Sequence, residues 1–389
     1  MDFIKQIEKL TPLSPSEDID WKQIEKLLAG TCFRGMKETP QNPVFHAEGD
    51  VYRHTQLVCG ELTKSPAFYV LPHRQRAELF LAALLHDIGK VKTTRKEDGI
   101  WVSPHHSATG SRITREFLWR DCGLCGERDR MIFRESVCGL IRYHTLPLHM
   151  MEKENPEKKA REVGSIGELA EDFSWKLLCM LAEADVKGRI AEDIEEELAL
   201  VSLSGMIAEE AGCLCAPCHF EDSHTRRAYF SGRNVYPEQI LFDDTWGEII
   251  MLSGLPGTGK DTWVQKNCPG LPVVSLDDIR KEKRVRPTDQ QGKVIQTAKE
   301  RAREYLRKKQ PFIWNATDLT LDTRKKLTSM FEQYKAGVRI VYLETSWSSM
   351  IERNDGRTAA VPAAIINRML KTTVPPMSYE ARTVEWLCV

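Results

Sequence analysis

The stretch EIIMLSGLPGTGKDT, residues 248–262, decides the fold of the C-terminal part, because an apolar run passes directly into a glycine-rich turn. Gly254–Lys260 fits the pattern G-x-x-x-x-G-K between a predicted strand and a predicted helix, the context in which it indicates a phosphate-binding P-loop. Glycines let backbone N–H groups turn toward phosphate oxygens, and the start of the helix adds its dipole. We therefore expect ATP or another NTP here, with Gly254, Gly257, Thr258, Gly259, Lys260, Asp261 and Thr262 around it.

One position departs from this pattern. The residue after the lysine, normally a Ser or Thr that holds Mg²⁺, is Asp261. A carboxylate can hold Mg²⁺ directly or through a water, so Asp261 is a candidate magnesium ligand. The alternative is an ordinary first-turn aspartate favoured by the helix dipole, with Thr262 or water on the metal.

The two halves of the chain differ in their periodicity. After residue 246, short apolar runs alternate with helical patterns, which predicts an α/β domain with a parallel sheet and helices on both faces. Before residue 212, helical periodicity dominates and predicts an all-α domain. The predicted domains are 1–211 and 247–389, joined by a connector or small functional element at 212–246. The predicted strands are 248–252, 271–275, 311–314 and 338–343, and the predicted helices are 74–85, 111–119, 134–143, 173–190, 191–203, 292–308 and 323–335.

Length and composition exclude several classes of protein. The 389 residues suit two domains, the formal net charge of −1 gives no global basic field, and no apolar run reaches the roughly 18 residues that span a bilayer. Eleven cysteines without an export signal indicate a reducing, cytoplasmic setting. Because no apolar run is long enough to span a bilayer, we expect no membrane partner. Cys213, Cys215 and Cys218 could form a zinc site with Cys122 and Cys125, but the spacing is not that of a standard finger, so scattered thiols are favoured.

Further candidate residues follow the predicted strand that ends at residue 275, which we expect to lie beside the P-loop strand. A carboxylate at the ligand edge of such a sheet can accept the proton of an attacking hydroxyl, which we assign to Asp277, while Asp278 is expected to cap the next helix. Arg280 lies about one helical turn further on. Arg353 and Arg357, in a glycine-bearing stretch, suit a lid that closes on the transferring phosphate, and an exposed charged loop is the alternative.

A basic patch begins next to this acceptor site. Residues 281–310 carry eleven basic and four acidic side chains, which is a local net charge of 11 − 4 = +7. A solvated helix face is one interpretation. The other is an electrostatic path that leads a nucleic-acid backbone toward the acceptor site.

The N-terminal part carries a second constellation, of histidines and aspartates on successive predicted helices. His86 and Asp87 are adjacent, so both can turn toward one metal, and a carboxylate can also bridge two metals. Mixed nitrogen and oxygen donors favour Mn²⁺, Fe²⁺, Ni²⁺, Co²⁺ or Zn²⁺ over Ca²⁺. A lone histidine is usually structural, so the prediction depends on the whole set. The predicted ligands are His54, His86, Asp87, His106, His144 and Asp185, and His46 is expected to support a ligand.

The C-terminal motifs resemble those of a known kinase family. GLPGTGKDTW at 254–263, LDDIR at 276–280 and RNDGRTAAVP at 353–362 are similar, in order and spacing, to the kinase domain of phage polynucleotide 5′-kinase. The resemblance implies that Asp277 is the general base on a 5′-hydroxyl and that Arg280 contacts the acceptor strand. It also implies that Arg353 and Arg357 form the lid, although the stretch is one residue shorter here.

The N-terminal motifs resemble the HD phosphohydrolase superfamily, in the order H…HD…H…H…D. That resemblance implies one metal on His54, His86, Asp87 and Asp185, and a second on His106, His144 and a bridging Asp87. It further implies that Lys90 and Arg189 stabilise a phosphorane-like transition state.

Together the two halves resemble the bacterial HD-domain polynucleotide kinases, which are bifunctional RNA end-healing enzymes. The resemblance implies phosphorylation of 5′-OH polynucleotide ends and removal of a 2′,3′-cyclic, 2′- or 3′-phosphate. The implied partners are RNA ends, or DNA ends, and the lack of a ligase signature in the sequence implies a separate RNA ligase. Two other classes remain open: a small-molecule nucleotide kinase fused to a phosphohydrolase, and a regulatory protein that senses a nucleotide.

Overall fold

The computed structural model describes residues 2–286, 289–357 and 360–389, which form two compact units. The first unit holds Met1–Leu124 and Asp129–Cys218, and the second holds Cys125–Arg128 and His219–Val389. The last passage of the chain from the first unit to the second, after Cys218, falls within the predicted connector 212–246. That connector also contains a helix, α12 (Ser223–Phe230), and the Arg227 side chain of α12 donates to both Glu332 carboxylate oxygens and to the Tyr379 carbonyl within the second unit.

The first unit is helical, as predicted. Its α-helices are α1 (Phe3–Leu10), α2 (Trp21–Leu27), α3 (Val51–Lys64), α4 (Pro66–Val70), α5 (His73–Leu85), α6 (Lys90–Thr93), α7 (His106–Glu116), α8 (Arg128–Tyr143), α9 (Pro156–Gly164), α10 (Trp175–Lys187) and α11 (Ile194–Glu210). Shorter helical turns are η1 (Phe33–Glu38), η2 (Phe117–Asp121), η3 (Leu146–Glu152) and η4 (Ser165–Glu168). The predicted helix at 191–203 thus begins three residues later than expected and continues to Glu210.

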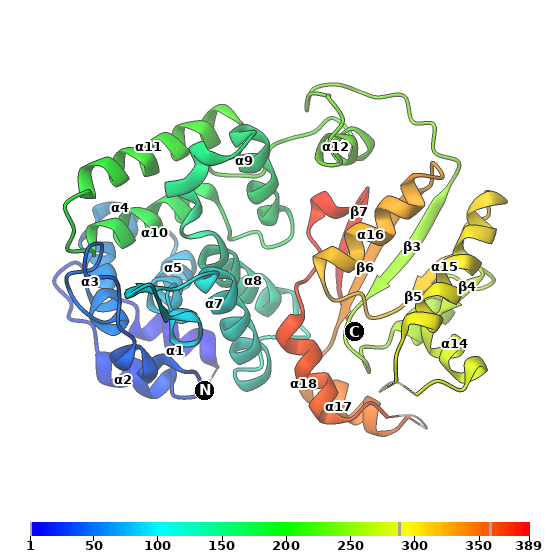
Figure 1. Ribbon diagram of the computed structural model, residues 1–389, viewed down its shortest axis with the longest axis horizontal. Coiled ribbons are helices and arrows are strands. Elements are labelled where there is room, and N and C mark those ends of the chain that lie inside the picture. The colour runs from blue at the N-terminus through cyan, green and yellow to red at the C-terminus, as the bar shows by residue number, and fades with distance from the viewer. Residues whose placement is uncertain (1, 287–288, 358–359) are drawn as a thin grey trace. The chain divides into compact units, whose positions relative to one another are not determined.

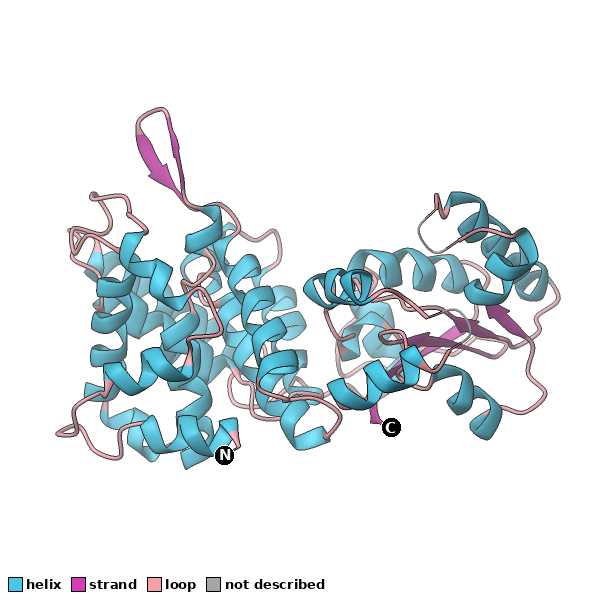
Figure 2. Cartoon of the chain, turned by 90° about the horizontal axis from the view of Figure 1, so that it is seen from below, coloured by secondary structure: helices cyan, strands magenta, loops and turns pink. Residues whose placement is uncertain are grey.

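One β-hairpin interrupts the helices, which the all-α prediction missed. Strands β1 (Arg95–Glu97) and β2 (Ile100–Val102) pair antiparallel and project from the helical unit (Figure 2). Asp98 and Gly99 connect them with φ of 48° and 85°, and an Asp-Gly pair is a favoured two-residue hairpin turn because both positions require positive φ.

The centre of the first unit is helix α5. Nine consecutive residues, Ala77–Leu85, are buried, so this helix is enclosed on every side rather than on one face. It packs against α1, α3 and α10. The residues that follow its last turn, His86 and Asp87, are therefore carried into the interior of the unit.

The second unit contains a five-stranded parallel sheet with the order β4-β5-β3-β6-β7 (Figure 1). The strands are β3 (Glu248–Ser253), β4 (Val273–Ser275), β5 (Ile313–Asn315), β6 (Gly337–Glu344) and β7 (Thr383–Cys388). The helices are α13 (Lys260–Asn267), α14 (Leu276–Lys283), α15 (Gly292–Arg307), α16 (Leu321–Glu332), α17 (Trp347–Asp355) and α18 (Ala363–Thr372), with a turn η5 (Ser378–Glu380). This confirms the predicted α/β class and adds β7, a strand that the sequence patterns missed.

The strand order corrects one expectation. The acceptor-site strand, β4, was expected beside the P-loop strand β3, but β5 lies between them and pairs with both. Because all five strands are parallel, their carboxyl ends still meet at one edge, where ligands bind in open α/β sheets. Side chains that follow β3, β4 and β5 therefore share the site.

Candidate metal centre and phosphate-binding loop

The six predicted metal ligands form one cluster inside the first unit. His54 lies on α3, His86 and Asp87 follow α5, His106 begins α7, His144 follows α8 and Asp185 lies on α10. Their side chains are at most 4% exposed, except for His106 at 19%. Five segments far apart in sequence thus deliver nitrogen and oxygen donors to one buried place.

Asp87 stands at the centre of this cluster. Its Oδ2 lies 3.4 Å from His86 Nε2 and 3.8 Å from His54 Nε2. Its Oδ1 lies 3.4 Å from His106 Nε2 and 3.8 Å from His144 Nε2. The two carboxylate oxygens therefore face two different groups of histidines, which is the arrangement that a ligand bridging two cations requires.

Asp185 completes the group around His54 and His86. Its Oδ1 lies 3.0 Å from His54 Nε2 and 3.9 Å from His86 Nε2. Burial opposes ionisation of Asp87 and Asp185, but Lys90 beside Asp87 and Arg189 beside Asp185, together with the surrounding histidines, hold both pKa values well below the usual range. The cluster thus keeps two negative charges for cations.

The histidine rings are oriented through their outer nitrogens. The Nδ1 atoms of His86, His106 and His144 lie 2.8, 2.9 and 2.8 Å from the carbonyl oxygens of Ala83, Ser103 and Ile141. A carbonyl only accepts, so each Nδ1 carries a proton and each ring turns its Nε2 inward. Burial lowers the pKa of His106, and lowers that of His144 to about 3, so both rings are neutral near pH 7.

His54 is oriented by a carboxylate that the sequence reasoning missed. Glu48 Oε1 lies 2.9 Å from His54 Nδ1 and 2.8 Å from His46 Nδ1, and its Oε2 accepts from the Ile190 N–H at 3.0 Å. His46 therefore contacts the residue that holds a predicted ligand, as a supporting histidine would. The available signal was the carboxylate two residues after His46 in HAEGD.

Two atoms of the cluster fit a bound cation for a further reason. His86 Nε2 and Asp87 Oδ1 are buried and have no hydrogen-bond partner in the described parts of the chain. A buried acceptor without a donor costs about 1–3 kcal/mol, and a divalent cation would satisfy both atoms. Imidazole and carboxylate donors together suit Mn²⁺, Fe²⁺, Co²⁺, Ni²⁺ or Zn²⁺.

The two basic residues expected beside this centre contact its carboxylates. Lys90 Nζ lies 2.7 Å from Asp87 Oδ2 and donates to Gln41 Oε1 at 2.7 Å. Arg189 lies 3.2 Å from Asp185 Oδ2 and also pairs with Glu197 at 2.7 Å. Both charges therefore lie beside the carboxylates of the cluster.

The cysteines do not gather in the same way. All eleven are free thiols, and none of the clustered donor groups found among the described residues includes a cysteine. Cys213 is buried whereas Cys215 is exposed.

In the second unit, the P-loop joins β3 to α13. Gly254, Gly257 and Gly259 adopt φ of 143°, 83° and 83°. A Cβ on Gly254 would lie 2.5 Å from the Leu343 carbonyl oxygen, so only glycine fits there. Lys260 begins α13 and donates to the carbonyls of Gly254 and Leu255 at 2.8 Å each.

The other P-loop side chains take different places. The Thr258 hydroxyl is buried and donates to the Leu255 carbonyl at 2.9 Å, so it stabilises the turn. Thr262 is exposed on α13. Burial lowers the pKa of Lys260 to about 8, while the charges of Asp261 and Asp277 oppose that shift.

Carboxylates and arginines meet beyond the loop. Asp277 forms an ion pair with Arg280, and its Oδ2 lies 3.4 Å from Arg357. Arg357 also lies 3.6 Å from Asp261 Oδ2. The structure therefore places the predicted base and the predicted magnesium ligand on either side of one guanidinium.

The second predicted lid residue, Arg353, lies in the last turn of α17 and not in a loop. A Cβ built on Gly259 would lie 3.5 Å from Arg353 Nη1, which places this guanidinium beside the P-loop. Arg357 follows α17 and precedes residues 358–359, which lie outside the described chain.

Two features at this edge differ from the sequence-based expectation. Asp278 does not cap α14; the Ser275 hydroxyl oxygen accepts from the Asp278 N–H at 3.1 Å, and the Asp278 side chain is exposed. The second feature is the end of β5, which the sequence reasoning missed. Asn315 donates to Asp261 Oδ1 at 2.7 Å, and burial raises the pKa of Asp318 to about 7.

Each of the two sites lies within a stretch that matches a known family. Residues 51–186 match the HD domain family, and residues 249–376 match an AAA domain family. No curated protein matches the chain. The chain is an HD-type, metal-dependent phosphohydrolase domain followed by a P-loop, NTP-binding, kinase-like domain. Every helix within the described residues is too short or too polar to cross a membrane.

Proposed function

We propose that this protein heals broken RNA ends. Its P-loop domain phosphorylates a 5′-hydroxyl end, and its HD domain removes a 2′,3′-cyclic, 2′- or 3′-phosphate. The observation that carries the proposal is the Asp277 carboxylate, 55% exposed between Arg280 and Arg357 at the P-loop edge, in a chain that also holds a buried HD cluster. A separate RNA ligase would then join the two healed ends.

The kinase reaction follows from the groups at the sheet edge. Asp277 accepts the proton of the 5′-hydroxyl while the hydroxyl oxygen bonds to the γ-phosphorus of the NTP. The bond between the γ-phosphorus and the β,γ-bridging oxygen breaks, and the NDP leaves. Lys260, Arg353 and Arg357 are placed to balance the charge on the transferring group. Mg²⁺, when bound, neutralises charge on the triphosphate, and Asp261 with its donor Asn315 is the oxygen ligand available for it.

The phosphohydrolase reaction follows from the buried cluster. His54, His86, Asp87 and Asp185 would hold one cation, and Asp87, His106 and His144 a second. Such ions, when bound, polarise a phosphate ester and acidify water. Water adds to phosphorus and one P–O bond to the ribose breaks, giving a monoester from the cyclic phosphate; a second water yields a hydroxyl and inorganic phosphate. Lys90 and Arg189 stabilise the added negative charge.

Charge on the second unit supports a polynucleotide as the acceptor. Within 281–310, three of the basic side chains pair with acids: Lys281 with Asp278, Arg301 with Glu282 and Arg303 with Glu300. The other eight form no ion pair within the described residues: Lys283, Arg284, Arg286, Lys293, Lys299, Arg307, Lys308 and Lys309. A free nucleoside would not need such a surface, whereas a phosphodiester backbone does.

One reaction tests both halves of the proposal. A 5′-OH RNA that ends in a 2′,3′-cyclic phosphate is incubated with NTP, Mg²⁺ and Mn²⁺, and both ends are scored. Lys260→Ala should abolish only the 5′ phosphorylation, and Asp87→Ala should abolish only the 3′-end processing. Phosphorylation of nucleosides but not of RNA would favour the small-molecule alternative, and no turnover at either end would favour a nucleotide sensor.

A further inference from the structure

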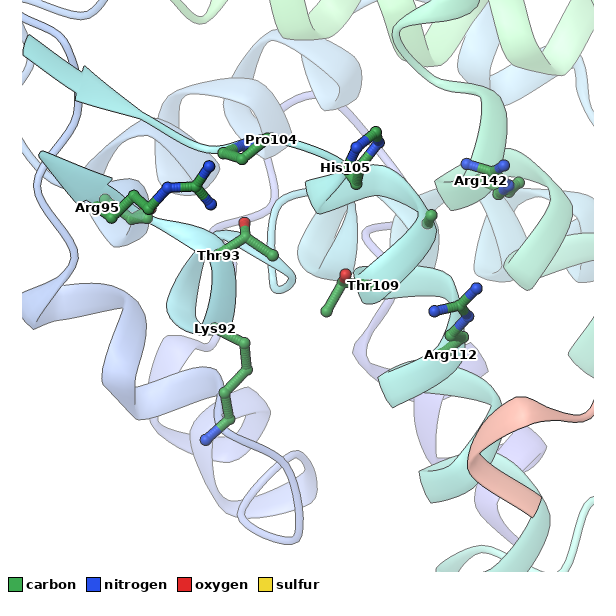
Figure 3. A pocket seen from close by; sticks show the side chains of 10 residues that line it. Lys92, Thr93, Arg95, Pro104, His105, Thr109, Arg112 and Arg142 are labelled. Carbon is green, nitrogen blue, oxygen red and sulfur yellow. The ribbon is translucent and has the colours of Figure 1, made fainter. Parts of the chain in front are cut away.

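A basic pocket of about 680 Å³ lies in the first unit, next to the metal cluster but outside it. Its walls come from the end of α6, the start of the hairpin, the first two turns of α7 and the end of α8. Figure 3 shows Thr93 and Thr109 at its middle with basic side chains around them. The lining residues are Lys92, Thr93, Thr94, Arg95, Pro104, His105, Ala108, Thr109, Arg112 and Arg142.

The pocket is suited to an anion by its charge. Four of its ten lining residues are Lys or Arg, and none is acidic. Arg95 pairs with Glu97, which stands outside the lining, at 2.5 Å. Lys92, Arg112 and Arg142 have no carboxylate partner in the described ranges of the chain, and all three are exposed. Unpaired cations around hydroxyl groups form a phosphate-binding surface, because Arg and Lys supply charge and threonines supply short hydrogen bonds.

The pocket is lined by segments of the chain that also carry metal ligands. His105 lines the pocket and the next residue, His106, faces Asp87; His105 adopts φ of 55°, so the chain turns sharply between them. Thr109 stands one helical turn after His106 on α7. Arg142 comes two residues before His144, and Thr93 comes one turn after Lys90.

The metal cluster is most exposed at His106, whose chain neighbour His105 lines the pocket. His106 is the ligand with the largest exposed side-chain fraction, 19%, whereas the other ligands are at most 4% exposed. A substrate whose phosphate binds the metals would therefore enter past His106, and the rest of the substrate would lie at the pocket. The volume lies in the range of about 300–1,000 Å³ that ligand sites occupy, so it exceeds what one inorganic phosphate would fill.

We propose that this pocket binds the phosphodiester backbone of the RNA strand just before the 3′-terminal nucleotide whose phosphate the HD site removes. This inference rests on the proposed function and assigns the strand-binding part of the phosphohydrolase site. Lys92, Arg112 and Arg142 hold the backbone phosphates, and the Thr109 hydroxyl donates to one of their oxygens. The pocket thereby makes the HD domain prefer a polynucleotide end over a mononucleotide.

The test compares substrates that differ only in the upstream strand. The full-length protein is assayed with Mn²⁺ and no NTP on a nucleoside 2′,3′-cyclic monophosphate and on 5′-phosphorylated oligonucleotides of two to six nucleotides with the same cyclic end. For the wild type, KM should fall as the first phosphodiesters are added. Arg112→Ala/Arg142→Ala should raise KM for the oligonucleotides roughly 10- to 100-fold, leaving the mononucleotide KM unchanged.

Two further measurements sharpen the result. The slope of log KM against log salt for the oligonucleotide should fall by about 0.7 for each lost contact with a single strand. The matched control Lys22→Ala/Lys176→Ala removes two exposed charges of the same unit outside the pocket and should change neither KM nor slope. Arg112→Lys retains the charge and should lie between wild type and Arg112→Ala, which also guards against a folding defect of the double variant.

The outcomes separate this inference from the proposed function. If the wild type processes RNA ends but the double variant matches it on every substrate, the pocket assignment is overturned and the proposed function stands. An equal loss on mononucleotide and oligonucleotide would mean that the arginines serve the reacting phosphate or a small anion, which also overturns the assignment. A wild type that cleaves the mononucleotide but no oligonucleotide would overturn both.

Discussion

The Nε2 atoms of His106 and His144 lie 3.4 Å apart, and neither carries a proton to share. Each ring donates its Nδ1 proton to a backbone carbonyl, and both pKa values are lowered by burial, so two lone pairs face one another. Such a pair repels unless a cation lies against both atoms. Asp87 Oδ1, which has no hydrogen-bond donor in the described chain, faces the same two rings and supplies the negative charge.

Removal of either imidazole ring should therefore lower the number of metal ions that the protein binds. After equilibration with Mn²⁺ and removal of excess ion, the wild type is expected to hold two equivalents by elemental analysis. His106→Ala or His144→Ala should lose about one equivalent, with a matching fall in the Mn²⁺-dependent rise of the melting temperature. His149→Ala removes an exposed histidine of the same unit and should leave the metal content unchanged. Equal occupancy in all four proteins would contradict the assignment.

The two sites could be predicted from sequence to different depths. The P-loop is a local motif, so Gly254–Lys260 determined both its place and its geometry. The metal ligands span 131 residues between His54 and Asp185, yet each lies in a recognisable short motif, so their grouping could be proposed before their distances were known. The roles of Glu48 and Asn315 could not be predicted, because the contact of Glu48 with His54 and that of Asn315 with Asp261 exist only in the folded chain.

The order of the strands in the sheet could not be predicted from the sequence either. Four of the five parallel strands in this sheet read as short apolar runs, and such runs do not encode their neighbours, so β4 was wrongly expected beside β3. The hairpin β1–β2 had a local signal, Asp98-Gly99, but its strands have only three residues each. The Asp278 error has the same origin: Ser275 and Asp278 both suit a helix start, and only the fold selects between them.

NTP binding should weaken above pH 8 because of Lys260. Burial lowers the pKa of this side chain to about 8, so in the free protein the ammonium is charged below that pH and neutral above it. A P-loop lysine binds phosphates as a cation, so the apparent Kd for NTP should be constant below pH 7.5 and rise up to about tenfold per pH unit above pH 8. Lys260→Arg should bind with a flat profile, since arginine remains charged. A flat wild-type profile from pH 7 to 9.5, measured with a fluorescent nucleotide, would rule this out.

Asp277→Asn should affect chemistry more than nucleotide binding. The side chain is 55% exposed and is held by Arg280 and Arg357, which suits a group that meets an incoming hydroxyl. Loss of a general base typically slows a reaction by about 10²- to 10⁴-fold, so kcat for 5′ phosphorylation should fall in that range with NTP Kd nearly unchanged. Asp278→Asn changes the neighbouring, exposed carboxylate and serves as the matched control. A large rise in NTP Kd for Asp277→Asn would instead assign this residue to the magnesium ion.

Asp261 should set how much Mg²⁺ the kinase requires. Its Oδ1 accepts from Asn315 and its Oδ2 lies 3.6 Å from Arg357, so the carboxylate is fixed at the first turn after the P-loop, where a hydroxyl usually holds the metal. Asp261→Ala should raise the Mg²⁺ concentration for half-maximal 5′ phosphorylation, and Asp261→Ser should restore it in part.

Three controls make this prediction specific. Asn315→Ala removes the donor that positions Asp261 and should shift the Mg²⁺ titration in the same direction by a smaller factor. Asp322→Ala removes another exposed aspartate from the first turn of a helix, α16, and should leave the titration where it is. HD activity should be the same in all these proteins. If Asp261→Ala gives the wild-type Mg²⁺ titration, Asp261 is a helix-start residue that interacts with the dipole, and the metal is held by Thr262 or by water.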